Sequence, residues 1–123
     1  MRASKSLIIF MSLFLGFFSV SAQSFEGYTL SETLDGVSLY YKVTEYGISF
    51  KVKNDRDKMV HVRIYDVSSD WTDGMNRTKD VDVTYIPEGT TRNGSYGHSD
   101  NYSKTTGSWS FRSWRWSEDG NDL

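Results

Sequence analysis

A strict alternation of apolar and polar residues runs through most of the chain and limits the folds open to it. In the run 37–43, apolar and polar positions alternate: Val37, Leu39, Tyr41 and Val43 are separated by Ser38, Tyr40 and Lys42. The same period of two recurs over 48–53, 60–65 and 81–85. Successive side chains of a strand point to opposite faces, so this period predicts strands that each bury one face. No segment shows the 3.6-residue pattern of an amphipathic helix.

The turn residues between these segments indicate how the strands connect. Gly, Asn and Asp separate the alternating runs, and Pro87-Glu88-Gly89 closes one of them. We therefore predict an all-β fold, an antiparallel two-sheet sandwich of immunoglobulin-like type. About seven short strands are expected, at 28–30, 37–43, 48–53, 60–65, 80–85, 94–97 and 109–116. The stretch 92–108, rich in Gly, Ser, Asn and Thr, is expected to be a long loop around one short strand.

The first 22 residues have the pattern of a secretory signal peptide. Arg2 and Lys5 precede an apolar run over 7–20, and Val20-Ser21-Ala22 is a small-residue cleavage site. The apolar run is broken by serine and glycine and is shorter than the ~18 to 20 residues of a membrane span. We expect cleavage after Ala22, a single β-sandwich domain over 23–117, a flexible tail over 118–123, and a secreted or periplasmic location.

Composition excludes several classes of protein. The chain has no cysteine, so neither a disulfide nor a thiolate nucleophile or ligand is available. Its formal net charge is −2, and removal of Arg2 and Lys5 with the leader makes the remainder more acidic. Proteins built to bind nucleic acid usually carry a strong basic excess, so we expect no nucleic-acid partner.

Catalytic and metal-site motifs are weak. The two histidines, His61 and His98, lack a ligand spacing, and His61 is expected on the solvent face of a strand. The triplet His98-Ser99-Asp100 has the residue types of a hydrolase triad, but sequence neighbours point in different directions. The loop from Asp70 to Asn76 has carboxylates and a glycine but lacks the alternating ligands of a calcium loop. We predict a protein that is not an enzyme and needs no metal or cofactor.

Basic residues are expected to gather on one outward sheet face. Such a row is either a solvated face or a surface for an anionic polysaccharide or lipid headgroup. The residues whose phase places them there are Lys42, Lys51, Lys53, His61 and Arg63, with Tyr40 and Tyr65 among them.

The segment 109–116, Trp-Ser-Phe-Arg-Ser-Trp-Arg-Trp, holds three of the four tryptophans. Strict alternation puts Trp109 and Phe111 on one side, and Trp114 and Trp116 on the other. Either one side is buried and the other displayed, or a bulge near Ser113 changes the phase.

We expect Trp114 and Trp116 to be the displayed pair, because the charged chain end follows them. Arginines beside indoles can stack on them for about 0.5 to 1 kcal/mol each. The displayed aromatics could then form a platform for sugar rings or sit at a membrane interface. The candidate ligand-binding residues are Trp71, Trp109, Trp114, Trp116, Arg112 and Arg115.

Two family resemblances follow from these motifs. A strand, the Asn54-led turn, a second strand and the turn Pro87-Glu88-Gly89-Thr90 resemble a generic exported bacterial immunoglobulin-like domain, which implies the sandwich and no fixed function. Residues 48–111 also resemble the aegerolysins, through Asn54 and Val60, Trp71, Pro87, and Gly97-x-Ser99-Asp100 leading to Thr105-Thr106-Gly107. That second resemblance implies membrane-lipid binding with a perforin-like, pore-forming partner.

The predicted function is therefore binding outside the cytoplasm by a non-catalytic, monomeric domain that does not span the membrane after cleavage. Its partner is expected to be a glycan, a lipid headgroup or a protein. An aegerolysin-like lipid-binding protein, a small exported inhibitor or immunity protein, and a carbohydrate-binding module stay open as alternatives.

Overall fold

The fold is built from eight strands in two antiparallel sheets that pack face to face. The computed structural model describes residues 25–97 and 104–123. The strands are β1 (Thr29–Leu34), β2 (Val37–Thr44), β3 (Gly47–Asn54), β4 (Val60–Trp71), β5 (Asn76–Ile86), β6 (Thr91–Gly97), β7 (Thr105–Ser110) and β8 (Ser113–Ser117). A single 3-10 turn, η2 (Gly120–Asp122), follows them in the described part of the chain.

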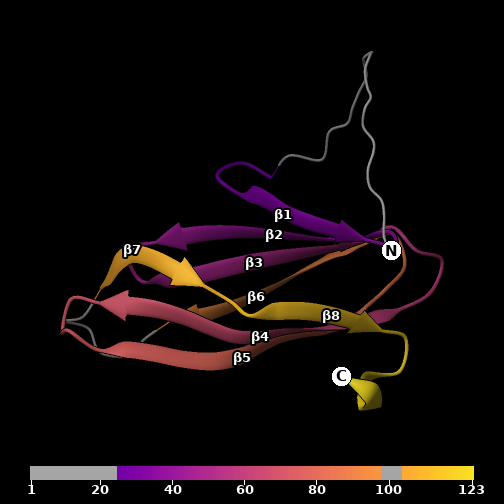
Figure 1. The fold of residues 1–123 in the computed structure, drawn as a ribbon. Coiled ribbons are helices and arrows are strands. Elements are labelled where there is room, and N and C mark those ends of the chain that lie inside the picture. Colours follow the sequence, from indigo (N-terminus) through magenta and orange to yellow (C-terminus); the bar gives the residue numbers. More distant parts are fainter. Residues whose placement is uncertain (1–24, 98–103) are drawn as a thin grey trace.

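Strand order defines the two layers. One sheet, here called sheet A, has the order β1-β2-β3-β6. The other, sheet B, has β5 on one side of β4, and both β7 and β8 on the other side. Figure 1 shows β1, β2 and β3 in the layer above β4 and β5, with β7 and β8 along one side of the sandwich. The predicted all-β, antiparallel two-sheet sandwich is confirmed.

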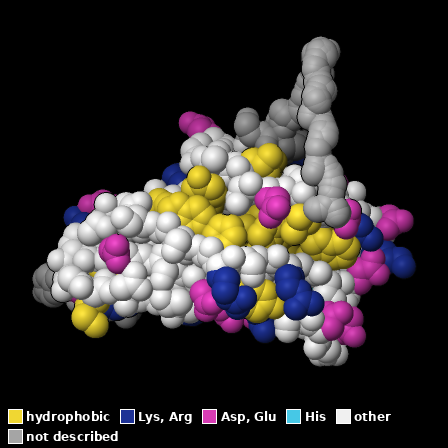
Figure 2. Space-filling view, viewed as in Figure 1, with side chains coloured by type: hydrophobic (Ala, Val, Ile, Leu, Met, Phe, Trp, Pro, Cys, Tyr) yellow, Lys and Arg dark blue, Asp and Glu magenta, His cyan; other side chains and the backbone are white. Residues whose placement is uncertain are grey.

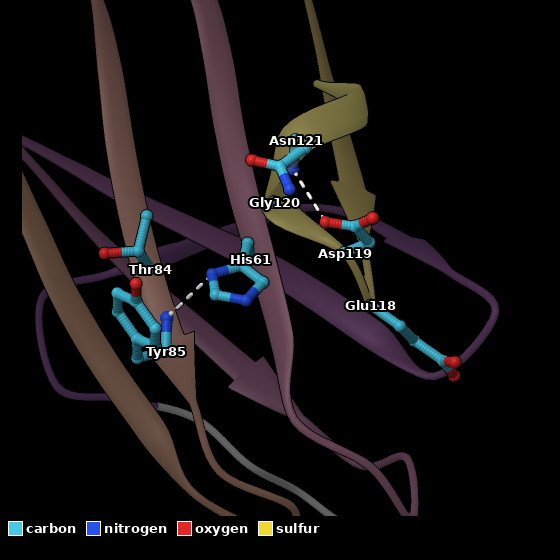
Figure 3. Close-up of a pocket in the computed structure, with 7 residues that line it drawn as sticks. All are labelled: His61, Thr84, Tyr85, Glu118, Asp119, Gly120 and Asn121. Atoms are coloured by element: carbon cyan, nitrogen blue, oxygen red, sulfur yellow. Dashed lines mark hydrogen bonds between the residues drawn. The ribbon is translucent and has the colours of Figure 1, made fainter.

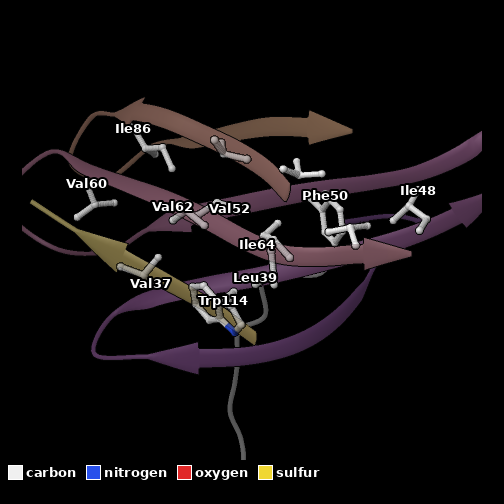
Figure 4. Close-up of a cluster of buried hydrophobic side chains, with 13 residues drawn as sticks. Val37, Leu39, Ile48, Phe50, Val52, Val60, Val62, Ile64, Ile86 and Trp114 are labelled. Carbon is white, nitrogen blue, oxygen red and sulfur yellow. The ribbon is translucent and has the colours of Figure 1, made fainter. Parts of the chain in front are cut away.

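The core lies between the inner faces of the two sheets. Cross-strand register places Leu39 opposite Val52 in sheet A, and Val62 opposite Val83 in sheet B. Figure 4 shows Leu39, Val52 and Val62 between the layers, with Phe50 and Trp114 as the largest rings among those labelled. Each fully buried aliphatic or Phe side chain stabilises the fold by about 1.5 to 3 kcal/mol. The buried cluster comprises Val37, Leu39, Ile48, Phe50, Val52, Val60, Val62, Ile64, Val67, Val81, Val83, Ile86 and Trp114.

A bulge in β4 interrupts the alternation. Ile64 and Val67 both face the core although they are three residues apart, and the pairing of β4 with β5 shifts between them. Within the bulge Asp66 has a φ of 56°, a left-handed conformation that asparagine and aspartate tolerate better than most residues. The backbone N–H of Arg112 donates to the carbonyl of Tyr65 at 2.9 Å, so the gap between β7 and β8 lies beside this bulge.

That break divides the segment 109–116 into two strands. β7 ends at Ser110 and β8 begins at Ser113, so the phase changes between Phe111 and Trp114. Trp114 lies in the core, and Trp109, Phe111 and Trp116 pack against it. The expectation that Trp114 is displayed is wrong, Trp116 is half-buried, and the alternative of a phase change near Ser113 is confirmed.

Other boundaries also differ from those predicted. β4 runs on to Trp71 and β5 begins at Asn76, so the acidic stretch 70–76 is the turn of a long hairpin. In the stretch 92–108, expected to be a loop around one short strand, β6 covers the expected strand at 94–97, and β7 begins at Thr105 where loop was expected. Residues 118–123, expected to be a flexible tail, contain η2, whose first turn is capped by the side chain of Asp119. The predicted leader lies outside the described residues.

Candidate ligand-binding surface

The four tryptophans predicted to bind ligand differ in exposure. Trp71 is 2% and Trp114 5% exposed, so each is part of the interior. Trp109 and Trp116 are half-buried at the edge of the core. Only these two therefore present indole surface to a ligand in this structure.

The arginines between the tryptophans point away from them. Arg112 and Arg115 are exposed, and the pairing of Arg115 with Arg63 of β4 puts it on the outer face of sheet B. Arg112 Nε donates to Asp66 Oδ2 at 2.6 Å, and its guanidinium lies 5.1 Å from the Tyr65 ring. The hydrogen bond to Asp66 raises the pKa of Arg112. Arg112 thus holds the bulge of β4 rather than stacking on an indole.

The indoles do have cationic partners, but from elsewhere in the chain. The guanidinium of Arg56, in the turn after β3, lies 4.3 Å from the ring of Trp116. That of Arg77 on β5 lies 6.0 Å from Trp71. The predicted stacking of neighbouring arginines on indoles is therefore wrong, while cation–π contact with indoles is present.

Half-buried apolar side chains line the side of the sandwich where β1 and β2 face β7 and β8. Figure 2 shows this band as a continuous run of hydrophobic side chains across the visible face. The rings of Trp109 and Tyr41 are 4.3 Å apart, and those of Trp109 and Phe111 are stacked at 5.2 Å. We call this surface the aromatic strip; it consists of Leu34, Tyr41, Val43, Trp109, Phe111 and Trp116.

Hydrogen bonds from two indoles fix the strip across both sheets. Trp116 Nε1 donates to the carbonyl of Leu34 at 2.9 Å, and Trp114 Nε1 donates to Glu32 Oε1 at 2.9 Å. Both acceptors belong to β1, and both donors to β8. The two sheet edges are thereby joined, and the rings are held in place before any ligand arrives.

A second concave surface surrounds His61 on the outside of sheet B. Figure 3 shows His61 between Tyr85 and the C-terminal turn, beside a pocket of about 390 Å³. The backbone N–H of Tyr85 donates to His61 Nδ1 at 3.1 Å. The ring is also covered by Gly120, where an added Cβ would lie 3.2 Å from it.

His61 therefore faces outward as predicted but is only 7% exposed, and the expectation that solvent covers it is wrong. The carboxylates beside it have local partners: Glu118 accepts from Arg56, and Asp119 caps η2. At this pocket the C-terminal turn packs onto sheet B. We therefore consider the pocket a weaker candidate for a ligand-binding site than the aromatic strip.

The acidic hairpin turn uses its carboxylates internally. Asp73 forms two hydrogen bonds with the guanidinium of Arg77 and accepts from the backbone N–H of Met75. Asp70 accepts from the side-chain amide of Asn76 at 2.8 Å. In residues 25–97 and 104–123, no group of three or more acidic or histidine side chains is placed to hold a metal ion.

The residues predicted to share one basic face lie on opposite sides of the molecule. Alternation placed each side chain outward correctly, but it did not say which sheet each strand joins. Lys42, Lys51, Lys53 and Tyr40 are on the outer face of sheet A, while His61, Arg63 and Tyr65 are on the outer face of sheet B.

Comparison with known proteins adds no family. No protein-family model, curated protein sequence or solved structure matches this chain. The resemblances to exported immunoglobulin-like domains and to aegerolysins therefore stay predictions. The triplet 98–100, part of the second resemblance, lies outside the described residues. Within the part of the chain that the structure covers, no helix is long and apolar enough to cross a bilayer.

Proposed function

We propose that this chain is an exported, non-catalytic binding domain whose ligand is an extracellular glycan held on the aromatic strip. The observation that carries the proposal is the gathering of half-buried rings along one open side of the sandwich (Figure 2). A contiguous exposed apolar surface on a small domain commonly marks a binding site. The signal-peptide pattern of residues 1–22 supports export.

The shape of the strip favours a sugar chain. Trp109 and Phe111 stack on each other with an interplanar angle of 27°, so the two rings form one continuous apolar surface rather than separate protruding tips. Sugar rings have apolar C–H faces, which pack on aromatic rings, and hydroxyl edges, which need polar partners. The carboxylate of Glu32, which accepts from Trp114 Nε1, supplies such a partner beside the strip.

The alternative ligands fit the strip less well. Insertion into a bilayer places apolar side chains ~5 to 10 Å deep, which requires them to project from the surface. Trp109 and Trp116 instead lie half-buried against the core. A stable protein interface needs roughly 800 Å² from each partner, with large anchors in its centre. Fixed rings with polar groups at their margins are more typical of a ligand site.

Glycan-array binding followed by affinity titration tests this proposal. Trp109→Leu keeps an apolar side chain against the core but removes the flat ring, and we expect a loss of affinity of about tenfold or more, or 1.4 kcal/mol. Tyr85→Leu is the matched control, because Tyr85 is 62% exposed but lies beside His61 on β5, which is separated from β7 by β4. The control should bind as the wild type does.

Three results would overturn the proposal. The first is equal affinity of Trp109→Leu and wild type while both stay folded in thermal melts. The second is binding to lipid vesicles with none to any glycan, which would favour the aegerolysin-like alternative. The third is capture of one extracellular protein with no glycan binding, which would favour an inhibitor or immunity protein.

A further inference from the structure

A row of lysines crosses the outer face of sheet A, on β2 and β3. The register pairs Lys42 with Ser49, Lys51 with Tyr40 and Lys53 with Ser38. Lys42, Lys51 and Lys53 therefore lie at successive levels along the strands. Same-face residues of a strand are about 7 Å apart along its axis, so the three lysine side chains leave the sheet at successive levels.

The segment before β1 folds over this row and fixes two of its members. The backbone N–H of Tyr28 donates to the carbonyl of Phe25 at 2.8 Å, which closes a turn above the sheet. The Phe25 ring meets Tyr40 edge-on at 4.9 Å. Lys42 Nζ lies 5.7 Å and Lys51 Nζ 5.1 Å from the centre of the Tyr28 ring, and Lys51 Nζ is also 5.5 Å from Phe25. Ring contacts thus hold both ammonium groups near one point.

The charges of these two lysines are not neutralised by the protein. Within residues 25–97 and 104–123, neither Lys42 nor Lys51 has a carboxylate at salt-bridge distance, whereas Lys53 is paired with Asp55. The outward positions of β2, β3 and β6 hold no Asp or Glu. Two like charges beside one tyrosine ring repel each other, and an anionic group between them would remove that repulsion.

We propose that the outer face of sheet A is a second binding site, for a linear anionic polysaccharide whose carboxylate or sulfate groups contact Lys42 and Lys51. It is separate from the aromatic strip, because it lies on the opposite face of β2, and it does not depend on the proposed function. Lys51 Nζ already donates to Asn93 Oδ1 at 3.0 Å. The remaining outward positions, Ser49, Ser95 and Thr91, are small and polar and suit sugar hydroxyls.

Other polyanions match this face less well. Single-stranded nucleic acids stack their bases on open aromatic faces, but Tyr28 and Phe25 already have ammonium groups beside their rings. An anionic membrane contributes about 1 kcal/mol for each lysine near its surface, so two unpaired lysines would hold the domain only weakly. A polysaccharide adds hydroxyl contacts along the strands to the same charges.

The test is calorimetric titration of the exported protein with heparin, polygalacturonate and neutral dextran. The double variant Lys42→Gln/Lys51→Gln should lose about tenfold or more in affinity for the two anionic polymers. The control variant Lys58→Gln/Lys104→Gln changes the net charge equally, but its two lysines lie in the turn after β3 and in the ion pair with Glu45. It should therefore bind nearly as the wild type does. Binding should weaken as added salt shortens the screening length.

Two further variants distinguish the possible causes of a loss of binding. Lys42→Arg/Lys51→Arg keeps both charges and should retain binding, which separates loss of charge from damage to the turn over the sheet. Trp109→Leu should leave heparin binding unchanged, so that failure of the strip and failure of this site are told apart. Equal loss in the two charge-matched variants, equal binding of dextran, or preference for phosphatidylglycerol vesicles or oligothymidylate over both polymers would each overturn the proposal.

Discussion

Replacement of Trp114 by alanine separates the core role of β8 from a display role. Trp114 is 5% exposed, lies opposite Ile64 of β4, and donates its indole N–H to Glu32 of β1. It therefore contacts the core, its own sheet and the edge of the other sheet. Arg115, its neighbour in sequence, is exposed on the outer face and provides the matched control.

The expected magnitudes differ by several-fold. Truncation of a buried Trp to Ala costs about 3 to 5 kcal/mol, through lost burial and the cavity left behind. The hydrogen bond to Glu32 adds about 1 kcal/mol at most, because that carboxylate is exposed and water can replace the indole. We expect a loss of about 4 to 5 kcal/mol for Trp114→Ala, and less than about 0.5 kcal/mol for Arg115→Ala.

Urea denaturation followed by circular dichroism measures both variants. A small domain has an m value of about 1 to 3 kcal/mol per M, so Trp114→Ala should lower the midpoint by about 1 to 5 M or unfold the chain outright. Trp114→Phe keeps most of the apolar volume and should fall between the two, losing about 1 to 2 kcal/mol. If Trp114→Ala and Arg115→Ala were equally mild, Trp114 would not be part of the core and the phase change would be refuted.

Alternation was sufficient where the pairing between neighbouring strands is uninterrupted. The run from Val37 to Val43 and that from Ile48 to Val52 were placed correctly, because β2 and β3 pair residue for residue along their whole length. The apolar members of both runs face the core. A regular ladder transmits the side-chain period directly to the fold, so sequence periodicity predicts it.

Alternation failed where two neighbouring strands change phase together. Ile64 and Val67 are spaced by three residues, and so are Phe111 and Trp114; each gap holds one residue too many for a strict period of two. That spacing is the sequence signature of a bulge, since an extra residue returns the next side chain to the same face. The phase of 109–116 depends on β4, the strand against which the segment pairs.

Long-range pairing was beyond what the sequence could provide. Trp116 stacks with Arg56, which lies far from it in the chain, rather than with Arg115 beside it. The burial of His61 depends on the C-terminal turn folding back over it. Both contacts follow from which strands are neighbours in space, and alternation assigns a face to each side chain without assigning a sheet.

Three further predictions concern contacts between and along the sheets. Gly94→Ala would place a Cβ 2.6 Å from Val83 Cγ2, so thermal melts should show a loss of about 1 to 3 kcal/mol; an unchanged melting temperature would contradict this close packing. Asn54 is fully buried, its amide donates to two backbone carbonyls at 2.8 and 3.0 Å, and Asn54→Ala should cost about 2 to 4 kcal/mol in urea because those carbonyls are left unpaired; a loss below about 0.5 kcal/mol would show that water replaces the amide. The hydrogen bonds from Arg63, at 2.7 and 3.0 Å, hold the pKa of Asp82 below its usual value. A lowered carboxylate pKa stabilises the fold above the unfolded-state value, and this contribution is lost as the pH falls through the folded-state value. Because both side chains are partly exposed, we expect Asp82→Asn to remove only about 0.5 kcal/mol at pH 7 and to flatten the decline in stability on acidification below about pH 4; an unaltered acid limb in the variant would mean that this ion pair is not coupled to folding.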